Sequence, residues 1–155
     1  MLPPTVIIRH RKENLKKCSL RGLEDRSDLR FLTYPITSVP QLNNYFLLSF
    51  DGPLLSKEDC HSGLIVLDGT WRYAKKMAEN LPFLASLPKR RLPKSIRTAY
   101  PRKQSDCPNP ERGLASIEAI FVAHLLLGRN VEGLLENYYW KKEFLSGLGI
   151  MKKIC

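Results

Sequence analysis

One aspartate stands where a run of apolar residues ends and a helical pattern begins. In the stretch LIVLDGTWRYAKKM, Asp68 follows Leu64–Leu67 directly, and Thr70 and Trp71 come after a single glycine. In open α/β sheets, ligands bind at the carboxyl ends of the strands. A carboxylate in that position can pair with a cationic group or accept a proton, and a threonine hydroxyl can cap the following helix. The junction therefore predicts a binding or catalytic site around Asp68.

The same junction also has an ordinary structural interpretation. Asp and Thr are common helix caps, and a tryptophan at the start of a helix often packs in the core. Under the functional interpretation, Trp71 would form one wall of an apolar pocket beside Asp68, with the helix N-terminus facing the ligand. Spacing alone leaves both interpretations open.

Short apolar stretches alternate with helical patterns along most of the chain. The apolar stretches are rich in β-branched and aromatic residues, which favours strands, several of them buried on both faces. This alternation is typical of a single α/β domain with a largely parallel sheet, expected here over residues 1–155. Three helices are predicted, the second of them with Ser116 as its N-cap. The predicted strands are 5–9, 30–35, 45–50 and 64–67, with 95–100 as a further candidate, and the predicted helices are 70–80, 116–128 and 131–147.

The chain carries 25 lysine and arginine residues against 15 aspartate and glutamate residues, a net charge of +10. Such a surface attracts polyanions, so nucleic acid is the expected partner. A membrane is disfavoured, because no apolar run reaches about 18 residues and no basic helix has a strong apolar face. The N-terminal stretch lacks the features of a secretory signal, and the four cysteines are not at metal-ligand spacing. We therefore expect a cytoplasmic protein without a metal site.

Basic residues cluster on both sides of the Asp68 junction in the sequence. A single charge run is usually a solvated face, but several runs around one predicted site favour a track for phosphate groups. The basic, proline-rich segment 88–114 carries part of this charge, and loops of that length are typically functional or mobile. His10 and His124 are interpreted as structural residues. The predicted RNA contacts are Arg11, Lys12, Lys16, Lys17, Lys75, Arg90, Arg91 and Arg102, with Tyr100 either stacking on a base or packing.

Several short motifs, in one order along the chain, resemble a known protein family. The stretch LDGTW, followed by Ala74, resembles the signature of the DTW-domain proteins. Those are RNA uridine aminocarboxypropyltransferases, related to the 18S rRNA aminocarboxypropyltransferases, whose own motif is Asp-Cys-Ser-Trp. Within HRKENLKKCSLRGLE, residues 17–19 stand where the rRNA enzymes carry a basic residue, Cys and Thr. The further matches are GPLLSKEDCHSGLIVLDGTW (52–71), YPR (100–102) and GLASIEAI (113–120).

The resemblance implies a fold and a cofactor. The fold is SPOUT-like, a parallel sheet with helices on both faces and a C-terminal trefoil knot. The cofactor is S-adenosylmethionine, whose methyl group would lie in an apolar pocket matched by Trp71 and Ala74, leaving the aminocarboxypropyl carbon to face the RNA. The backbone around Ser19 would hold the cofactor's carboxylate. The full set of implied cofactor contacts is Ser19, Leu55, Asp68, Thr70, Trp71, Ala74, Leu114, Ser116 and Glu118.

Two acidic residues have open roles. Asp68 would either pair with the ammonium of the transferred group or accept the imide proton of the target uridine. The first role is favoured, because an ordinary aspartate is a weak base for so weak an acid. Glu118 belongs either to the site or to the first turn of its helix as a carboxylate that complements the dipole.

Three functions follow from the resemblance and the charge. The first is transfer of the 3-amino-3-carboxypropyl group to N3 of a uridine in structured RNA, tRNA or rRNA, with release of methylthioadenosine. The alternatives are a SPOUT-type RNA methyltransferase and a non-catalytic RNA-binding or ribosome-assembly factor, because fold alone does not choose among them. The oligomeric state is open between monomer and homodimer.

Overall fold

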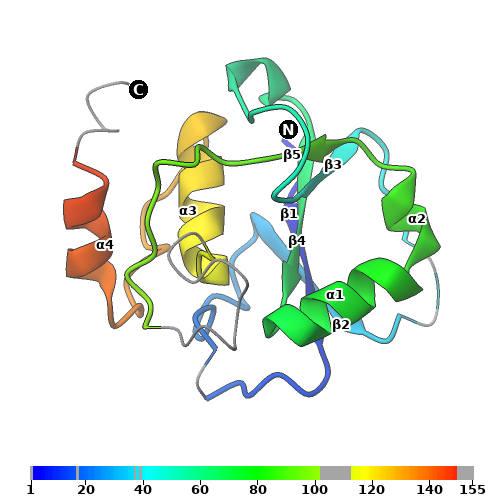
Figure 1. Ribbon diagram of the computed structural model, residues 1–155, viewed down its shortest axis with the longest axis horizontal. Helices are drawn as coiled ribbons and strands as arrows, with labels where there is room; N and C mark the ends of the chain where they lie inside the picture. Colours follow the sequence, from blue (N-terminus) through cyan, green and yellow to red (C-terminus); the bar gives the residue numbers. More distant parts are fainter. Residues whose placement is uncertain (1, 17, 37, 39, 102–112, 150–155) are drawn as a thin grey trace.

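A five-stranded, all-parallel sheet lies at the centre of the molecule (Figure 1). The computed structural model describes residues 2–16, 18–36, 38, 40–101 and 113–149, and for Trp71 the backbone only. The strand order is β2-β1-β4-β3-β5, so the neighbouring interior strands β1 and β4 come from distant parts of the sequence. The strands are β1 (Thr5–His10), β2 (Leu29–Tyr34), β3 (Tyr45–Leu48), β4 (Gly63–Asp68) and β5 (Lys89–Arg90).

Both faces of this sheet are covered by helices. In Figure 1, α1 (Trp71–Asn80) and α2 (Pro82–Ala85) lie on one side of the strands, and α3 (Ser116–Leu126) and α4 (Lys141–Gly147) lie on the other. A short 3₁₀ helix, Lys57–Asp59, precedes β4. Within the described part of the chain, no helix has the length and apolar character that a bilayer crossing requires.

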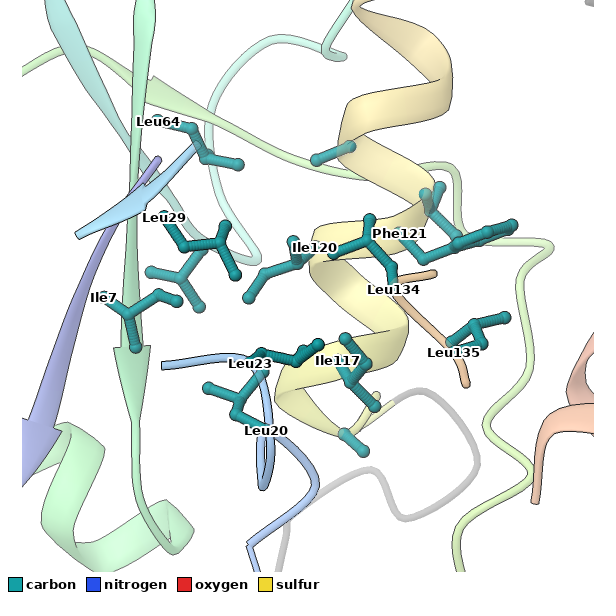
Figure 2. Close-up of a cluster of buried hydrophobic side chains, with 14 of the residues drawn as sticks. Ile7, Leu20, Leu23, Leu29, Leu64, Ile117, Ile120, Phe121, Leu134 and Leu135 are labelled. Carbon is teal, nitrogen blue, oxygen red and sulfur yellow. The ribbon is translucent and has the colours of Figure 1, made fainter. Parts of the chain in front are cut away.

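The buried residues form one apolar cluster on each side of the sheet. Successive residues of a strand point to opposite faces, so Ile7 packs toward α3 while Val6 and Ile8 pack toward α1. All six residues of β1 are buried, as expected for a central strand with both faces covered. Figure 2 shows the α3 side, where Ile117 and Ile120 of the helix meet side chains of the strands and of the 20–23 loop.

The structure confirms the four predicted strands, with small differences at their ends, and the predicted helix after Asp68. The fifth strand is Lys89–Arg90, so the candidate at 95–100 is wrong. The predicted helix 131–147 is also wrong over its first ten residues, which form turns. Gly133 has a φ of +78° there, and successive backbone bonds join residues three apart, which interrupts a regular helix.

Candidate functional site

The strand register places two charged residues side by side at the carboxyl edge of the sheet. Strands β1 and β4 pair in parallel, with Arg9 opposite Asp68. Both residues point to the α3 face, because they follow Ile7 and Val66 by two positions. The Nε of Arg9 donates to Oδ2 of Asp68 at 3.2 Å. The predicted aspartate therefore meets a cation from its own sheet.

Asp68 is 3% exposed, and both of its carboxylate oxygens accept hydrogen bonds. Oδ1 accepts from Oγ of Ser116, at the start of α3, at 2.7 Å. Oδ2 accepts from Arg9 and, at 3.4 Å, from the Sγ of Cys18. Three donors, one of them the Arg9 guanidinium, therefore engage the two oxygens of this carboxylate inside the protein, which leaves them less available to a substrate proton. This geometry disfavours the general-base role for Asp68.

Cys18 completes this buried cluster as a neutral thiol. Burial first, and then the negative charge of Asp68, raise the pKa of Cys18 to about 12. The thiol therefore stays protonated at neutral pH and acts as a donor, not as a nucleophile. Glu13, Cys18 and Asp68 have ligand atoms within 4.8 Å of one another, the spacing of a metal site. The Arg9 guanidinium contacts the last two residues, so a metal cation bound there would meet its repulsion.

A cavity of about 420 Å³ opens at the carboxyl ends of β3 and β4, between α1 and the start of α3. Its volume and position are those of small-molecule sites in parallel α/β sheets. Most of its wall is apolar. Four basic side chains and one acidic side chain, Asp51, line it among the described residues, and the basic ones are Lys75, Lys89, Arg91 and Lys94.

Glu118 holds the wall of this cavity together without lining it. It is fully buried, and its carboxylate accepts four hydrogen bonds from three segments of the chain. The backbone N–H of Ala115 and the hydroxyl of Thr98 donate to Oε1 at 2.7 and 2.6 Å. The N–H of Ala99 and the hydroxyl of Tyr138 donate to Oε2 at 2.8 and 3.1 Å. Both earlier interpretations of Glu118 are therefore incomplete, because it fastens segment 98–99 to the N-terminus of α3.

Three of the residues implied as cofactor contacts line the cavity: Ala74, Leu114 and Ser116. Ser116 is the first residue of α3, and Ala115 takes the N-cap position that was predicted for it. Thr70 caps α1 as predicted, accepting from the N–H of Tyr73 at 3.4 Å.

Two further implied contacts, Ser19 and Leu55, are not among the described residues that line the cavity. Ser19 is tied to α3, where its Oγ accepts from the N–H of Ile117 at 3.2 Å. Leu55 is 1% exposed in the core and is not among the described residues that line the cavity. The side chain of Trp71 lies outside the part of the chain that the structure describes.

The predicted RNA contacts fall into separate groups. Lys75 and Arg91 line the cavity, whereas the Nε of Arg90 donates to Asp59 at 3.1 Å and so has a structural partner. Tyr100 is half-buried against the core. The remaining described contacts, Arg11, Lys12 and Lys16, are exposed in the loop after β1. Lys17 and Arg102 lie outside the described residues.

The two histidines that were interpreted as structural, His10 and His124, are both buried, and each contacts neighbouring side chains. The Nε2 of His124 lies 2.7 Å from Oγ1 of Thr5 and thereby joins α3 to β1. The His10 ring stacks on Tyr73 with 3.9 Å between ring centroids, and its Nδ1 accepts from the N–H of Lys12. Burial lowers the pKa of both rings.

Sequence reasoning missed Arg9, Phe50 and Asp51. Arg9 was visible only as one charge in a basic cluster, although a charged residue at the end of an apolar strand is itself a signal for a site. Phe50 and Asp51 belong to a predicted strand and its end, but β3 stops at Leu48 and both residues line the cavity.

Comparison with known proteins identifies the family of this chain. A solved structure, the SAM-dependent rRNA:acp-transferase Tsr3 from Vulcanisaeta distributa, has the same fold, with a TM-score of 0.69 and 20% sequence identity. That match covers 99% of this chain and 81% of the other chain. No curated protein sequence matches the chain. The family model described as DTW domain matches residues 1–144, and the chain therefore belongs to the DTW domain family.

Proposed function

We propose that this protein transfers the 3-amino-3-carboxypropyl group of S-adenosylmethionine to N3 of a uridine in structured RNA. The observation that carries the proposal is the cavity of about 420 Å³ at the carboxyl ends of β3 and β4 in a chain of the DTW domain family. The described fold is similar to that of Tsr3, an SAM-dependent rRNA:acp-transferase.

The residues around the cavity fit S-adenosylmethionine in three ways. Apolar side chains, among them Val66, Ala74 and Leu92, suit the adenine ring and the methyl group. The carboxylate of Asp51 supplies the negative charge that an ammonium or sulfonium group prefers. Ser116 brings the N-terminal end of α3, with its positive dipole, to the wall, where it suits the carboxylate of the amino-acid end.

S-adenosylmethionine would supply a sulfonium group that activates the bond between its sulfur and the aminocarboxypropyl carbon. Uridine N3 would take that carbon, methylthioadenosine would leave with the electron pair of the broken bond, and the imide proton would pass to water. The protein contributes position, because orientation decides which carbon on the sulfur reacts. Asp68 acts through Ser116: it accepts the hydrogen bond that orients the hydroxyl at the cavity wall. Asp68 is thus a positioning residue in this proposal.

We also propose that residues 1–155 form a single SPOUT-like domain with a C-terminal trefoil knot. One continuous sheet and a family match over residues 1–144 support the single domain. The expected knotted half comprises the basic segment 88–114 and the predicted helix 116–128, and residues 102–112 lie outside the described part of the chain. Limited proteolysis that yields one resistant fragment would support the single domain.

The experiment that tests the function is a transfer assay with S-adenosylmethionine labelled separately in its methyl and carboxyl groups. Unmodified tRNA and rRNA are offered in parallel. We expect carboxyl label, without methyl label, to enter one of them. Methyl label alone would make the protein a methyltransferase. No label in either RNA, together with RNA binding and no cofactor binding by calorimetry, would establish the non-catalytic factor.

A pair of variants tests the positioning role of Asp68. Ser116→Ala removes the donor of this hydrogen bond and Asp68→Asn removes the charge of its acceptor, so we expect both to weaken cofactor binding and the double variant to be little worse than either. Calorimetric titration of the cofactor measures this. If Asp68→Asn weakens binding and Ser116→Ala does not, the direct ammonium role of Asp68 replaces the positioning role. Asp51→Asn serves as the comparison for a carboxylate that lines the cavity.

A further inference from the structure

Phe50 is a large apolar residue at the mouth of the cavity. It lines the cavity and is 51% exposed, so it stands where the cavity meets solvent. Leu54, in the same loop after β3, is 46% exposed but is not among the described lining residues. A half-exposed aromatic residue at the entrance of a binding cavity is a candidate contact for an incoming ligand.

The turn that carries Phe50 is held firmly against β5. The N–H of Ser49 donates to the carbonyl of Arg90, and the N–H of Arg91 donates to the carbonyl of Pro53, both at 2.9 Å. Between these two bonds Gly52 has a φ of +90°, and a Cβ there would lie 2.6 Å from the carbonyl oxygen of Lys89. The turn therefore presents Phe50 in a fixed place, which lowers the entropy that binding would cost.

Basic side chains line the same cavity as this aromatic residue. Lys75 on α1 and Lys89 and Arg91 beside the Phe50 turn line the same cavity. An aromatic side chain among lysines and arginines is the arrangement with which proteins bind single-stranded nucleic acid, because bases stack on the ring while phosphates meet the cations. A protein partner or a lipid tail would use an apolar surface and would not need these charges in the same cavity.

We infer that Phe50 is the stacking platform for an unpaired base of the RNA acceptor at the cavity mouth. This inference rests on the proposed function and adds to it a residue that recognises the acceptor. The acceptor is then required to be single-stranded at the target position, because a base inside a helix cannot reach the ring.

The first test measures the binding of a fluorescein-labelled single-stranded oligouridylate RNA by anisotropy at several salt concentrations. We expect Phe50→Ala to weaken binding roughly tenfold, the usual loss for one stacked base, and Phe50→Trp to stay within about twofold of the original chain. The salt dependence should be unchanged in Phe50→Ala, whereas Lys75→Ala should lower its slope by about 1. Leu54→Ala is the matched control and should bind like the original chain.

The second test titrates the same variants with S-adenosylmethionine in the absence of RNA. We expect Phe50→Ala to bind the cofactor as the original chain does. A loss of cofactor affinity without a loss of RNA affinity would assign Phe50 to the adenine ring and overturn the inference, as would RNA binding that is indifferent to Phe50→Ala. RNA binding that depends on Phe50 in a chain that transfers no label would keep the inference and overturn the proposed function.

Discussion

The two helix N-termini at the cavity are held in different ways. At the start of α1, Thr70 makes a local cap to Tyr73, three residues away, at 3.4 Å. At the start of α3, the buried carboxylate of Glu118 binds Thr98, Ala99, Ala115 and Tyr138, which come from three separate segments. The first helix end is fixed by its own sequence, and the second by long-range contacts.

This difference separates the most recognisable residues from those that organise the site. The Asp-Gly-Thr-Trp junction carries the family signature, yet it supplies only part of the cavity wall. At the start of α3, Ser116 donates a hydrogen bond to the Asp68 carboxylate, and Glu118 accepts one from the 98–99 segment. Changes at α3 should therefore disturb the whole site, and changes at the α1 cap should stay local.

The largest effect is expected for Glu118→Gln. Glutamine has one oxygen and one NH₂ group where glutamate has two oxygens, so its NH₂ would face the N–H of either Ala99 or Ala115. That buried N–H would lose its acceptor, which should lower the unfolding free energy by about 3 kcal/mol. Chemical denaturation measures the loss. Glu79→Gln, on the exposed surface of α1, is the control and should change stability by less than about 0.5 kcal/mol. Equal effects in both variants would remove the special role of Glu118.

A smaller effect is expected for Ser116→Ala. The variant removes one hydrogen bond to a buried carboxylate, which contributes about 2 kcal/mol. Asp68 keeps Arg9 and Cys18 as donors, so the loss should remain below that of Glu118→Gln. The same denaturation experiment ranks the two variants. A larger loss for Ser116→Ala would mean that Asp68, and not Glu118, is the main attachment of α3.

Thr70→Ala tests the other helix end. Loss of a threonine N-cap typically lowers the unfolding free energy by about 1 kcal/mol. Because the Thr70 cap is exposed and local, we expect its loss to lower the unfolding free energy by no more than that. Cofactor affinity should stay close to that of the original chain, which calorimetry checks. A large loss of affinity would show that the Thr70 side chain contacts the cofactor directly. Thr70→Ser, which keeps the hydroxyl, should recover the lost stability.

The smallest effect is a dependence on pH at the far end of α3. Burial lowers the pKa of His124, so the folded protein favours the neutral ring more strongly than the unfolded chain does. Its stabilising contribution is therefore fully present above the ordinary histidine pKa of about 6.5 and is lost progressively as the pH falls from there through the lower pKa of the folded state. The expected loss between pH 7.5 and 6 is at most about 0.8 kcal/mol. His124→Gln should flatten this dependence in denaturation curves, and an unchanged slope would assign it to another group.

Much of the fold was predictable from local patterns. Apolar runs such as 5–9 and 64–67 form central strands that are buried except for the partly buried Leu67, and sequence period and composition are enough to find them. Strand β5 has only two residues, both basic, and it exists because β3 pairs with it. The stretch 131–140 has helical apolar spacing, but Gly133 at positive φ and the turn bonds around it override that spacing.

The site was predictable in part, for a similar reason. Asp68 stood out because it ends an apolar run, and Ala74 and Ser116 followed from the resemblance. The partnership of Arg9 with Asp68 depends on the pairing of β1 with β4, which no local pattern reveals. The same is true of Glu118, whose role depends on donors that lie far from it in the sequence.

The strand order also has a consequence during synthesis on the ribosome. The buried strand β1 lies between β2 and β4, and β4 begins about 60 residues after β1. At typical translation rates, an apolar segment that belongs in the middle of the sheet waits roughly 3–12 s for its second neighbour. Over that interval TVIIR is a natural target for chaperones and for aggregation, so expression at lower temperature or with added chaperones should raise the yield of soluble protein.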